Sequence, residues 1–218
     1  GSAPVQNIGA YGIELADLFY NLRAWDNMRG EIVTLTKEDC RFGYRQSVFK
    51  EWPNRYIILS VSLLLKKEGT PHLGYGQISS KLVSLGVTNP SPLDVMNVIR
   101  AIRQEKLPDT KMVGCAGSFF KNPVVSIDFF NSLKVEFPEM PSYVMDEHFI
   151  KIPAGWLIEQ CGWKGYRKGD VGVWPQQALV IVNYGRATGQ ELLSLSFEII
   201  ESVKKRFNVI LYPEVNVL

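Results

Sequence analysis

The chain has 218 residues, of which 46% are hydrophobic and 21% are charged, and its formal net charge is +2. Burial of this much apolar surface offsets the entropy lost on ordering, which excludes a disordered protein and leaves one large or two small domains. The near balance of charge gives no indication of a nucleic-acid partner, and no apolar run approaches the roughly 18 residues that cross a bilayer.

The first part of the chain is typical of short strands separated by turns. Glu31–Leu35 follows the turn signal Arg29-Gly30, so we expect it to be a strand leaving a hairpin. Tyr56–Leu65 is rich in β-formers, and its unbroken apolar stretch predicts a strand that is buried on both faces.

A helix is predicted near the middle of the chain. Ser91 is a suitable N-cap and Pro92 a suitable first helical residue, and apolar residues recur at helical spacing through about Glu105. Pro108 ends this helix because proline disfavours helical geometry in the residue before it. Residues 106–109 are therefore the best candidate for a boundary between two halves.

The second half alternates helices with strands, which favours an α+β or α/β sandwich. The expected elements are a helix capped by Ser126, a short helix from Pro153 that ends at Gly162, a buried strand over Gln177–Asn183, a long helix capped by Thr188 with Leu192, Leu195, Ile199 and Val203 on one stripe, and a final strand over Phe207–Leu211.

Two loops combine glycine with aromatic or cationic residues. Gln6–Gly12 has two glycines and an alanine around one aromatic residue, so its backbone could approach a phosphate or a flat ring, or it could be an ordinary turn. Arg41–Ser47 places two arginines beside aromatics and a glycine. Such an arginine either clamps a carboxylate or oxyanion or lies on the surface over an aromatic ring.

Two later segments carry a hydroxyl and a carboxylate. Ser118 follows small residues and precedes two phenylalanines, and its hydroxyl could act as a nucleophile or as a proton donor. A nucleophile needs a general base, and the pattern lacks Gly-x-Ser-x-Gly spacing, so hydrolase chemistry is disfavoured. Glu214 follows a proline after the final predicted strand, which alone indicates almost nothing.

The cysteines and histidines indicate neither a disulfide framework nor a metal site. Cys40, Cys115 and Cys161 are widely spaced and have no CxxC pattern, so we expect reduced thiols in a cytoplasmic protein without a bound metal. The chain has only two histidines, His72 and His148, and we expect no chemistry that depends on histidine.

Seven segments, taken in order, resemble the UDP-N-acetylenolpyruvoylglucosamine reductase family, and the match runs from residue 4 almost to residue 218. The Ala-Gly-Ser-Phe-Phe-Lys-Asn-Pro segment is the most specific of them. The segments are Asn-Ile-Gly-Ala-Tyr-Gly (7–12), Phe-Gly-Tyr-Arg-Gln-Ser-Val-Phe (42–49), Lys-Leu-Pro-Asp (106–109), Ala-Gly-Ser-Phe-Phe-Lys-Asn-Pro (116–123), Ala-Gly-Trp-Leu-Ile-Glu-Gln-Cys (154–161), Gln-Gln-Ala-Leu-Val (176–180) and Pro-Glu-Val (213–215).

The resemblance implies a bacterial cytoplasmic flavoenzyme of peptidoglycan precursor synthesis. NADPH would reduce bound FAD, which would then pass hydride to the enolpyruvyl double bond of UDP-N-acetylglucosamine enolpyruvate and yield UDP-N-acetylmuramate. By the family's pattern Ser118 would give the proton, and Arg45 and Glu214 would flank the enol intermediate. Arginine suits that place because its fork can meet a new negative charge.

The resemblance also implies ligand contacts. Tyr75 would lie over the diphosphate and places the chain in the subtype with the tyrosine loop, and Lys106 would bind a phosphate or carboxylate. The remaining expected substrate contacts are Asn122 and Gln177, and the flavin would be bordered, mostly through backbone atoms, by Asn7, Ile8, Gly9, Ala10, Tyr11 and Gly12. We expect no obligate protein partner. The chain departs from the family's pattern at Cys115, in place of asparagine, and at Asn216, in place of arginine.

The resemblance further implies an α+β fold that begins inside a longer enzyme. We expect residues 1–107 to be the remainder of an FAD-binding (PCMH-type) α+β domain, 108–206 to form a small α/β substrate-binding domain, and 207–218 to be a C-terminal strand and tail carrying Glu214. The family's glycine-rich phosphate loop is missing, so we expect the chain as given to retain no FAD and to lack turnover. The alternatives are a non-catalytic UDP-sugar-binding fragment and a relative among FAD-linked oxidases that shares only the fold.

Overall fold

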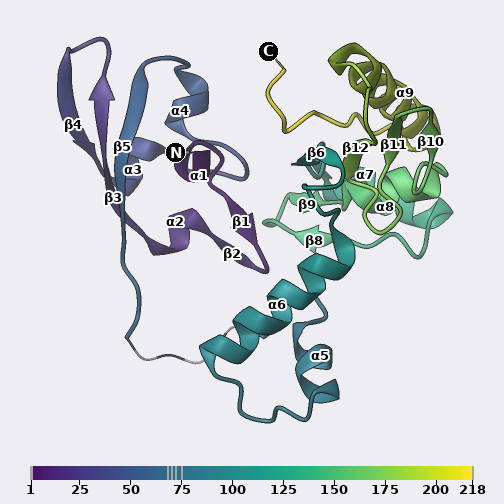
Figure 1. Ribbon diagram of the computed structural model, residues 1–218, viewed down its shortest axis with the longest axis horizontal. Coiled ribbons are helices and arrows are strands. Elements are labelled where there is room, and N and C mark those ends of the chain that lie inside the picture. Colours follow the sequence, from purple (N-terminus) through teal and green to yellow (C-terminus); the bar gives the residue numbers. More distant parts are fainter. Residues whose placement is uncertain (1, 68, 70, 72, 75, 218) are drawn as a thin grey trace. The chain divides into compact units, whose positions relative to one another are not determined.

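The computed structural model describes residues 2–67, 69, 71, 73–74 and 76–217. The chain divides into two compact units, Gly1–Ile99 and Arg100–Leu218, which we call unit 1 and unit 2. The division falls inside helix α6 (Pro92–Lys106). Each unit combines helices with antiparallel sheets (Figure 1).

Unit 1 is built on a three-stranded antiparallel sheet. Its strand order is β4-β3-β5, with β3 at Phe19–Asp26, β4 at Glu31–Leu35 and β5 at Tyr56–Leu63. The predicted hairpin after Arg29-Gly30 is confirmed, since β4 pairs with β3 and the intervening Gly30 has a φ of 69°. That left-handed geometry carries no steric cost for glycine.

Only one face of this sheet is buried, and the prediction that residues 56–65 are buried on both faces is wrong. Leu22 and Ala24 are fully buried on the covered face, which packs with Val48 of α4. On the other face Ile57 and Leu59 are 55% and 52% exposed. Successive strand residues point to opposite faces of a sheet, so an unbroken apolar run shows that both faces are apolar but not that both are covered.

The other elements of unit 1 are short. A two-stranded hairpin lies near the amino terminus, small helices flank the sheet, and one further helix precedes α6. They are α1 (Ser2–Val5), β1 (Gly9–Ala10), β2 (Ile13–Glu14), α2 (Leu15–Leu18), α3 (Lys37–Cys40), α4 (Val48–Glu51) and α5 (Ile78–Ser84).

In its described residues, unit 2 contains two antiparallel sheets and, after the last turns of α6, three further helices. One sheet has the order β10-β11-β12-β6 and the other the order β7-β9-β8. Helix α9 packs on β11 and β12 (Figure 1). The elements are β6 (Gly114–Ser118), β7 (Val124–Ser126), α7 (Ile127–Glu136), β8 (Tyr143–Val144), β9 (Phe149–Lys151), α8 (Ala154–Gln160), β10 (Arg167–Lys168), β11 (Val171–Val173), β12 (Val180–Asn183) and α9 (Gly189–Phe207).

The helix starts predicted from capping residues are confirmed. The Ser91 and Ser126 hydroxyls accept hydrogen bonds from backbone N–H groups three residues later, at 3.2 and 3.3 Å. Thr188 does the same for Glu191, whose carboxylate accepts from the Thr188 backbone in return. The hydrogen bonds that the Glu191 carboxylate accepts from the Thr188 N–H and hydroxyl hold the pKa of that carboxyl below its usual value. Gly162, with a φ of 80°, follows α8 as expected.

The predicted stripe of α9 faces the core of unit 2. Leu195, Ile199 and Val203 are buried there, and Leu192 packs against the same cluster. Burial of aliphatic side chains is the main force that holds an amphipathic helix on its sheet.

The prediction of a final strand over Phe207–Leu211 is wrong. Helix α9 runs through Phe207, and the chain then leaves through Asn208, whose φ of 53° is left-handed. Val209 and Leu211 are buried but belong to no strand. An apolar pattern predicts burial, whereas a strand also needs a neighbouring strand to accept its backbone hydrogen bonds. The strand expected from Gln177 is also shorter, because β12 begins at Val180 after a turn.

Among the described residues, no helix is long and apolar enough to cross a membrane.

The three cysteines should differ sharply in reactivity. All three are free thiols, and Cys40 is fully buried while Cys115 and Cys161 are half-buried. Burial, with smaller effects from nearby carboxylates, raises the pKa of the Cys40 thiol to about 12. Since the thiolate is the reactive species, iodoacetamide at about pH 8 should modify Cys115 and Cys161 at least about 10-fold faster than Cys40. Peptide mass mapping of the native protein measures the three rates, and equal labelling would contradict this environment for Cys40.

Candidate functional site

The Gly9–Gly12 turn presents small and apolar groups to solvent. Strands β1 and β2 pair across it, and Tyr11 and Gly12 have φ values of 56° and 82°. Ile8 and Ile13 on either side are 55% and 43% exposed. Exposed apolar side chains beside a tight backbone turn suit contact with a flat aromatic ring.

Arg45 lies against this turn. Its Nη2 donates a hydrogen bond to the Gly9 carbonyl at 2.8 Å, and its guanidinium carbon is 5.3 Å from the centre of the Tyr44 ring. Gly43 and Gln46 exchange backbone hydrogen bonds on either side of Arg45, which has a φ of 53°. The structure therefore brings together two segments of unit 1 that the sequence singled out separately.

The side chain of Asn7 was missed by the sequence analysis, which assigned this residue only a place beside the flavin. It is 1% exposed, and its amide bonds both to Glu14 and to the Gly43 carbonyl. The available signal was weak, since an asparagine before Ile-Gly is also typical of an ordinary turn.

In unit 2, Ser118 is the last residue of β6 and is exposed. It lies opposite Val180 of β12, and Gly117 before it has a φ of 79°. The Phe119 N–H after it donates to the Leu179 carbonyl at 2.7 Å. Ser118 is thus an exposed residue whose backbone is held by the sheet.

Glu214 lies beside the same segment. Its backbone N–H donates to the Phe119 carbonyl at 2.8 Å, and the Lys121 N–H donates to the Tyr212 carbonyl at 2.9 Å. The tail after α9 therefore pairs with the residues that directly follow Ser118. This pairing joins two segments that are distant in sequence.

Asn122 and Gln177 lie near the start of α8 in unit 2. Asn122 Oδ1 accepts from the Ala154 N–H at 2.9 Å, and Gln177 Oε1 accepts from the Leu179 N–H at 3.3 Å. A Cβ added to Gly155 would lie 3.3 Å from Gln177 Oε1. Four of the predicted site residues thus gather in one region of unit 2: Ser118, Asn122, Gln177 and Glu214.

The remaining predicted residues are placed as follows. Lys106 is exposed as the last residue of α6, which puts it in unit 2. Arg45 and the 7–12 segment belong to unit 1. Tyr75 lies outside the described residues. In the described part of the chain, no three or more His, Cys, Asp or Glu side chains are grouped as metal ligands would be.

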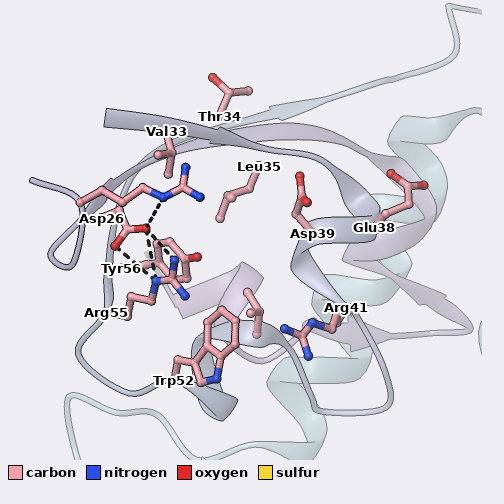
Figure 2. Close-up of a pocket in the computed structure, with 12 residues that line it drawn as sticks. Asp26, Val33, Thr34, Leu35, Glu38, Asp39, Arg41, Trp52, Arg55 and Tyr56 are labelled. Atoms are coloured by element: carbon pink, nitrogen blue, oxygen red, sulfur yellow. Dashed lines mark hydrogen bonds and ion pairs between the residues drawn. The ribbon is translucent and has the colours of Figure 1, made fainter. Parts of the chain in front are cut away.

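A pocket of about 440 Å³ in unit 1 is a second candidate site. Figure 2 shows the Asp26 carboxylate and the Arg55 guanidinium facing each other in it. Two nitrogens of Arg55 bond to Asp26 at 2.9 to 3.3 Å, and the guanidinium carbon lies 4.4 Å from the Trp52 ring centre and 4.8 Å from that of Tyr56.

Three of the charged residues that line this pocket, Asp26, Arg55 and Arg41, are paired within the protein. Asp26 is 1% exposed and also accepts from the Met28 N–H at 2.9 Å, inside the β3–β4 hairpin. Arg41 is paired with Glu51 at 2.9 Å. A buried carboxylate is costly unless it is paired and hydrogen-bonded, and Asp26 is both.

Stability at acid pH should depend on Asp26. The hydrogen bond from Arg55 is the largest cause that holds the pKa of Asp26 below its usual value. Between that usual value and the lowered one, the unfolded chain binds more protons than the folded chain, so stability falls as pH falls through this window. Asp26→Asn should lower the melting temperature at neutral pH by several degrees and flatten its decline below about pH 4. Thermal unfolding across pH tests this, and an unchanged acid profile in the variant would contradict it.

The sequence is similar to one family of known proteins. A family model for the C-terminal domain of UDP-N-acetylenolpyruvoylglucosamine reductase matches residues 108–218. A reductase of that name from Pseudomonas syringae pv. tomato is 49% identical over 216 residues, which cover 99% of this chain and 64% of the relative. A reductase of the same name from Flavobacterium johnsoniae is 47% identical and covers 100% of this chain and 65% of its own length. The chain thus spans less than two thirds of these relatives.

The fold has a solved counterpart. The crystal structure of UDP-N-acetylenolpyruvylglucosamine reductase from Thermus caldophilus matches with a TM-score of 0.60 and 24% identity, over 100% of this chain and 59% of that chain. This likeness shows the fold alone. Together with the mixed helices and antiparallel sheets, it confirms the predicted α+β class.

Proposed function

The chain belongs to the UDP-N-acetylenolpyruvoylglucosamine reductase family, and we propose on that premise that it carries the proton-donating and substrate-binding part of that enzyme's site. The reaction is the NADPH-dependent, FAD-mediated reduction of UDP-N-acetylglucosamine enolpyruvate to UDP-N-acetylmuramate, for peptidoglycan precursor synthesis. The observation that carries the proposal is the pairing of Glu214 with the residue after Ser118, at 2.8 Å between the Glu214 nitrogen and the Phe119 oxygen.

The residues of unit 1 fit a flavin at the Gly9–Gly12 turn. The exposed Ile8 and Ile13 side chains offer apolar contact, and the turn offers backbone groups at close approach. FAD bound there would accept hydride from NADPH and pass it to the substrate's double bond. Of the residues expected to border it, Ile8, Gly9, Ala10, Tyr11 and Gly12 reach the surface, whereas Asn7 is 1% exposed and supports the turn from beneath.

The chain's own residues stabilise the negative charge that forms on the substrate and donate the proton that removes it. Addition of hydride to the enolpyruvyl double bond leaves negative charge that is shared with the carboxylate, and the Arg45 fork is suited to meet it. Ser118 Oγ donates the proton to the carbon beside the carboxylate. Glu214, whose backbone pairs with the residue after Ser118, holds or relays a proton near it.

The substrate contacts follow from the same assignment. Lys106 would bind a phosphate or the carboxylate, and Tyr75 would cover the diphosphate. Asn122 and Gln177, both close to the start of α8, would bind the UDP-sugar. Amide side chains suit this role because each offers both donors and an acceptor.

A chimera tests the proposal. Residues 1–218 replace the matching stretch of the Pseudomonas syringae relative, with that relative as the positive control. We expect the chimera to oxidise NADPH when UDP-N-acetylglucosamine enolpyruvate is added and not when UDP-N-acetylglucosamine is added. A folded, flavin-containing chimera that oxidises NADPH at equal rates with either sugar nucleotide would overturn the proposal. That outcome would favour the oxidase alternative.

A further inference from the structure

The loop that carries Arg45 is fixed by side chains within unit 1. Ser47 Oγ donates to the Val5 carbonyl at 2.8 Å. Lys50 Nζ donates to the Arg45 carbonyl at 2.9 Å and to Gln6 Oε1 at 2.7 Å. The φ of 53° at Arg45 is one that a residue other than glycine keeps only when its surroundings hold it there. The backbone position of Arg45 is therefore imposed by its neighbours.

Asn7 joins this loop to the Gly9–Gly12 turn. Its Nδ2 donates to the Gly43 carbonyl at 3.0 Å and to Glu14 Oε2 at 2.7 Å, and its Oδ1 accepts from the Ala16 N–H at 3.0 Å. An asparagine amide has two N–H donors and one oxygen acceptor. All of these groups are used inside the protein, and the residue is 1% exposed.

The Arg45 guanidinium depends on the same connection. Its Nη2 donates to the Gly9 carbonyl at 2.8 Å. A Cβ added to Gly9 would lie 3.3 Å from Arg45 Nη1 and 2.8 Å from Glu14 Cγ, so these three residues are in close contact. Because Asn7 holds Glu14 on one side and the Gly43 end of the Arg45 loop on the other, a change at Asn7 moves both supports of the guanidinium.

We propose that Asn7 is a positioning residue that sets the place of the Arg45 guanidinium by joining the Gly9–Gly12 turn to the Phe42–Ser47 loop. Its enclosed amide acts through Arg45 and not by touching a ligand. The proposal rests on the proposed function only for what Arg45 does to the substrate, since the joining itself is a property of unit 1.

Asn7→Gly in the 218-residue chain is the direct test. Asn7 has a φ of 40°, and glycine keeps that backbone while removing only the side chain. The control is Asn54→Gly, the same change at another left-handed asparagine of unit 1, with a φ of 66°. The readouts are the carbonyl-carbon resonance of Gly9, which reports its hydrogen bond from Arg45, and the amide exchange rate of Ala16.

We expect Asn7→Gly to shift the Gly9 carbonyl resonance in the direction that Arg45→Met shifts it, and to speed Ala16 exchange by about 10-fold or more. Asn54→Gly should leave both at wild-type values. If Asn7→Gly does not fold, Asn7→Asp keeps the acceptor for Ala16, removes both donors, and must give the same carbonyl shift. An unmoved Gly9 resonance, or equal shifts in the variant and its control, would overturn the proposal.

The chimera separates this proposal from the proposed function. There Asn7→Gly should lower kcat by about 10²-fold with a smaller change in KM, and it should add no further loss in an Arg45→Met background. Full additivity of the two changes would overturn the positioning role. A chimera without reductase activity, combined with the expected resonance shift in the chain, would overturn the proposed function and still support the positioning role.

Discussion

Ser118→Ala in the chimera should lower the formation of UDP-N-acetylmuramate by about 10²- to 10⁴-fold, the usual contribution of a positioned general acid or base. Reduction of the flavin by NADPH should continue at the unchanged rate, because that half-reaction needs no proton from Ser118. Stopped-flow absorbance measures the flavin step, and quenched samples measure the product.

The position of Ser118 lets its hydroxyl be removed without a change in the packing of unit 2. Ser118 is exposed at the end of β6, so loss of its hydroxyl leaves the packed core of unit 2 untouched. Ser132→Ala is the matched control, since the Ser132 hydroxyl bonds only locally to the Phe129 carbonyl of α7. Loss of both half-reactions in Ser118→Ala, or an equal loss of product in Ser132→Ala, would argue against the proton-donor role.

Arg45→Lys should lower kcat/KM by about 10²- to 10³-fold even though it keeps the positive charge. Lysine presents a single ammonium group and cannot reproduce the planar fork, one nitrogen of which bonds to the Gly9 carbonyl at 2.8 Å. Steady-state kinetics of the chimera with varied UDP-N-acetylglucosamine enolpyruvate measure the effect.

Arg41→Lys provides the control for Arg45. Arg41 is in the same stretch of sequence, but its side chain is about half exposed and pairs with Glu51. An exposed ion pair of this kind contributes little, so Arg41→Lys should keep wild-type kinetics. Wild-type kcat/KM in Arg45→Lys would remove Arg45 from the site, and equal losses at the two positions would indicate a general effect on the loop.

The features that the sequence predicted well are local ones. Ser91, Ser126 and Thr188 were identified as caps because the donor they satisfy lies three residues away, inside the same short window. The stripe on α9 was visible for a similar reason, since helical periodicity repeats over neighbouring turns. The errors arose where the answer depends on a distant partner. Val209 and Leu211 are buried but belong to no strand, and Ile57 is exposed on an uncovered sheet face.

In the candidate site, too, the contacts between distant residues were the part that the sequence did not predict. The family's segments predicted Arg45, Ser118 and Glu214 as site residues, but not the contacts that surround each of them within its own unit. Asn7 reaches Gly43 across 36 positions of the chain. Helix α9 packs on β11 and β12, and the tail after it brings Glu214 to Phe119, the residue directly after β6. Such connections come from tertiary packing, which no local pattern encodes.

In the proposed reaction, the site in this chain protonates a reduced enolpyruvyl group. The measurement that tests it most directly is the mass and NMR spectrum of the sugar nucleotide after the chimera has turned over in D₂O with unlabelled NADPH. We predict UDP-N-acetylmuramate that carries one deuterium at the carbon beside the carboxylate, because the proton added there comes from solvent through Ser118. A sugar nucleotide recovered unchanged while NADPH and oxygen are consumed would contradict the account.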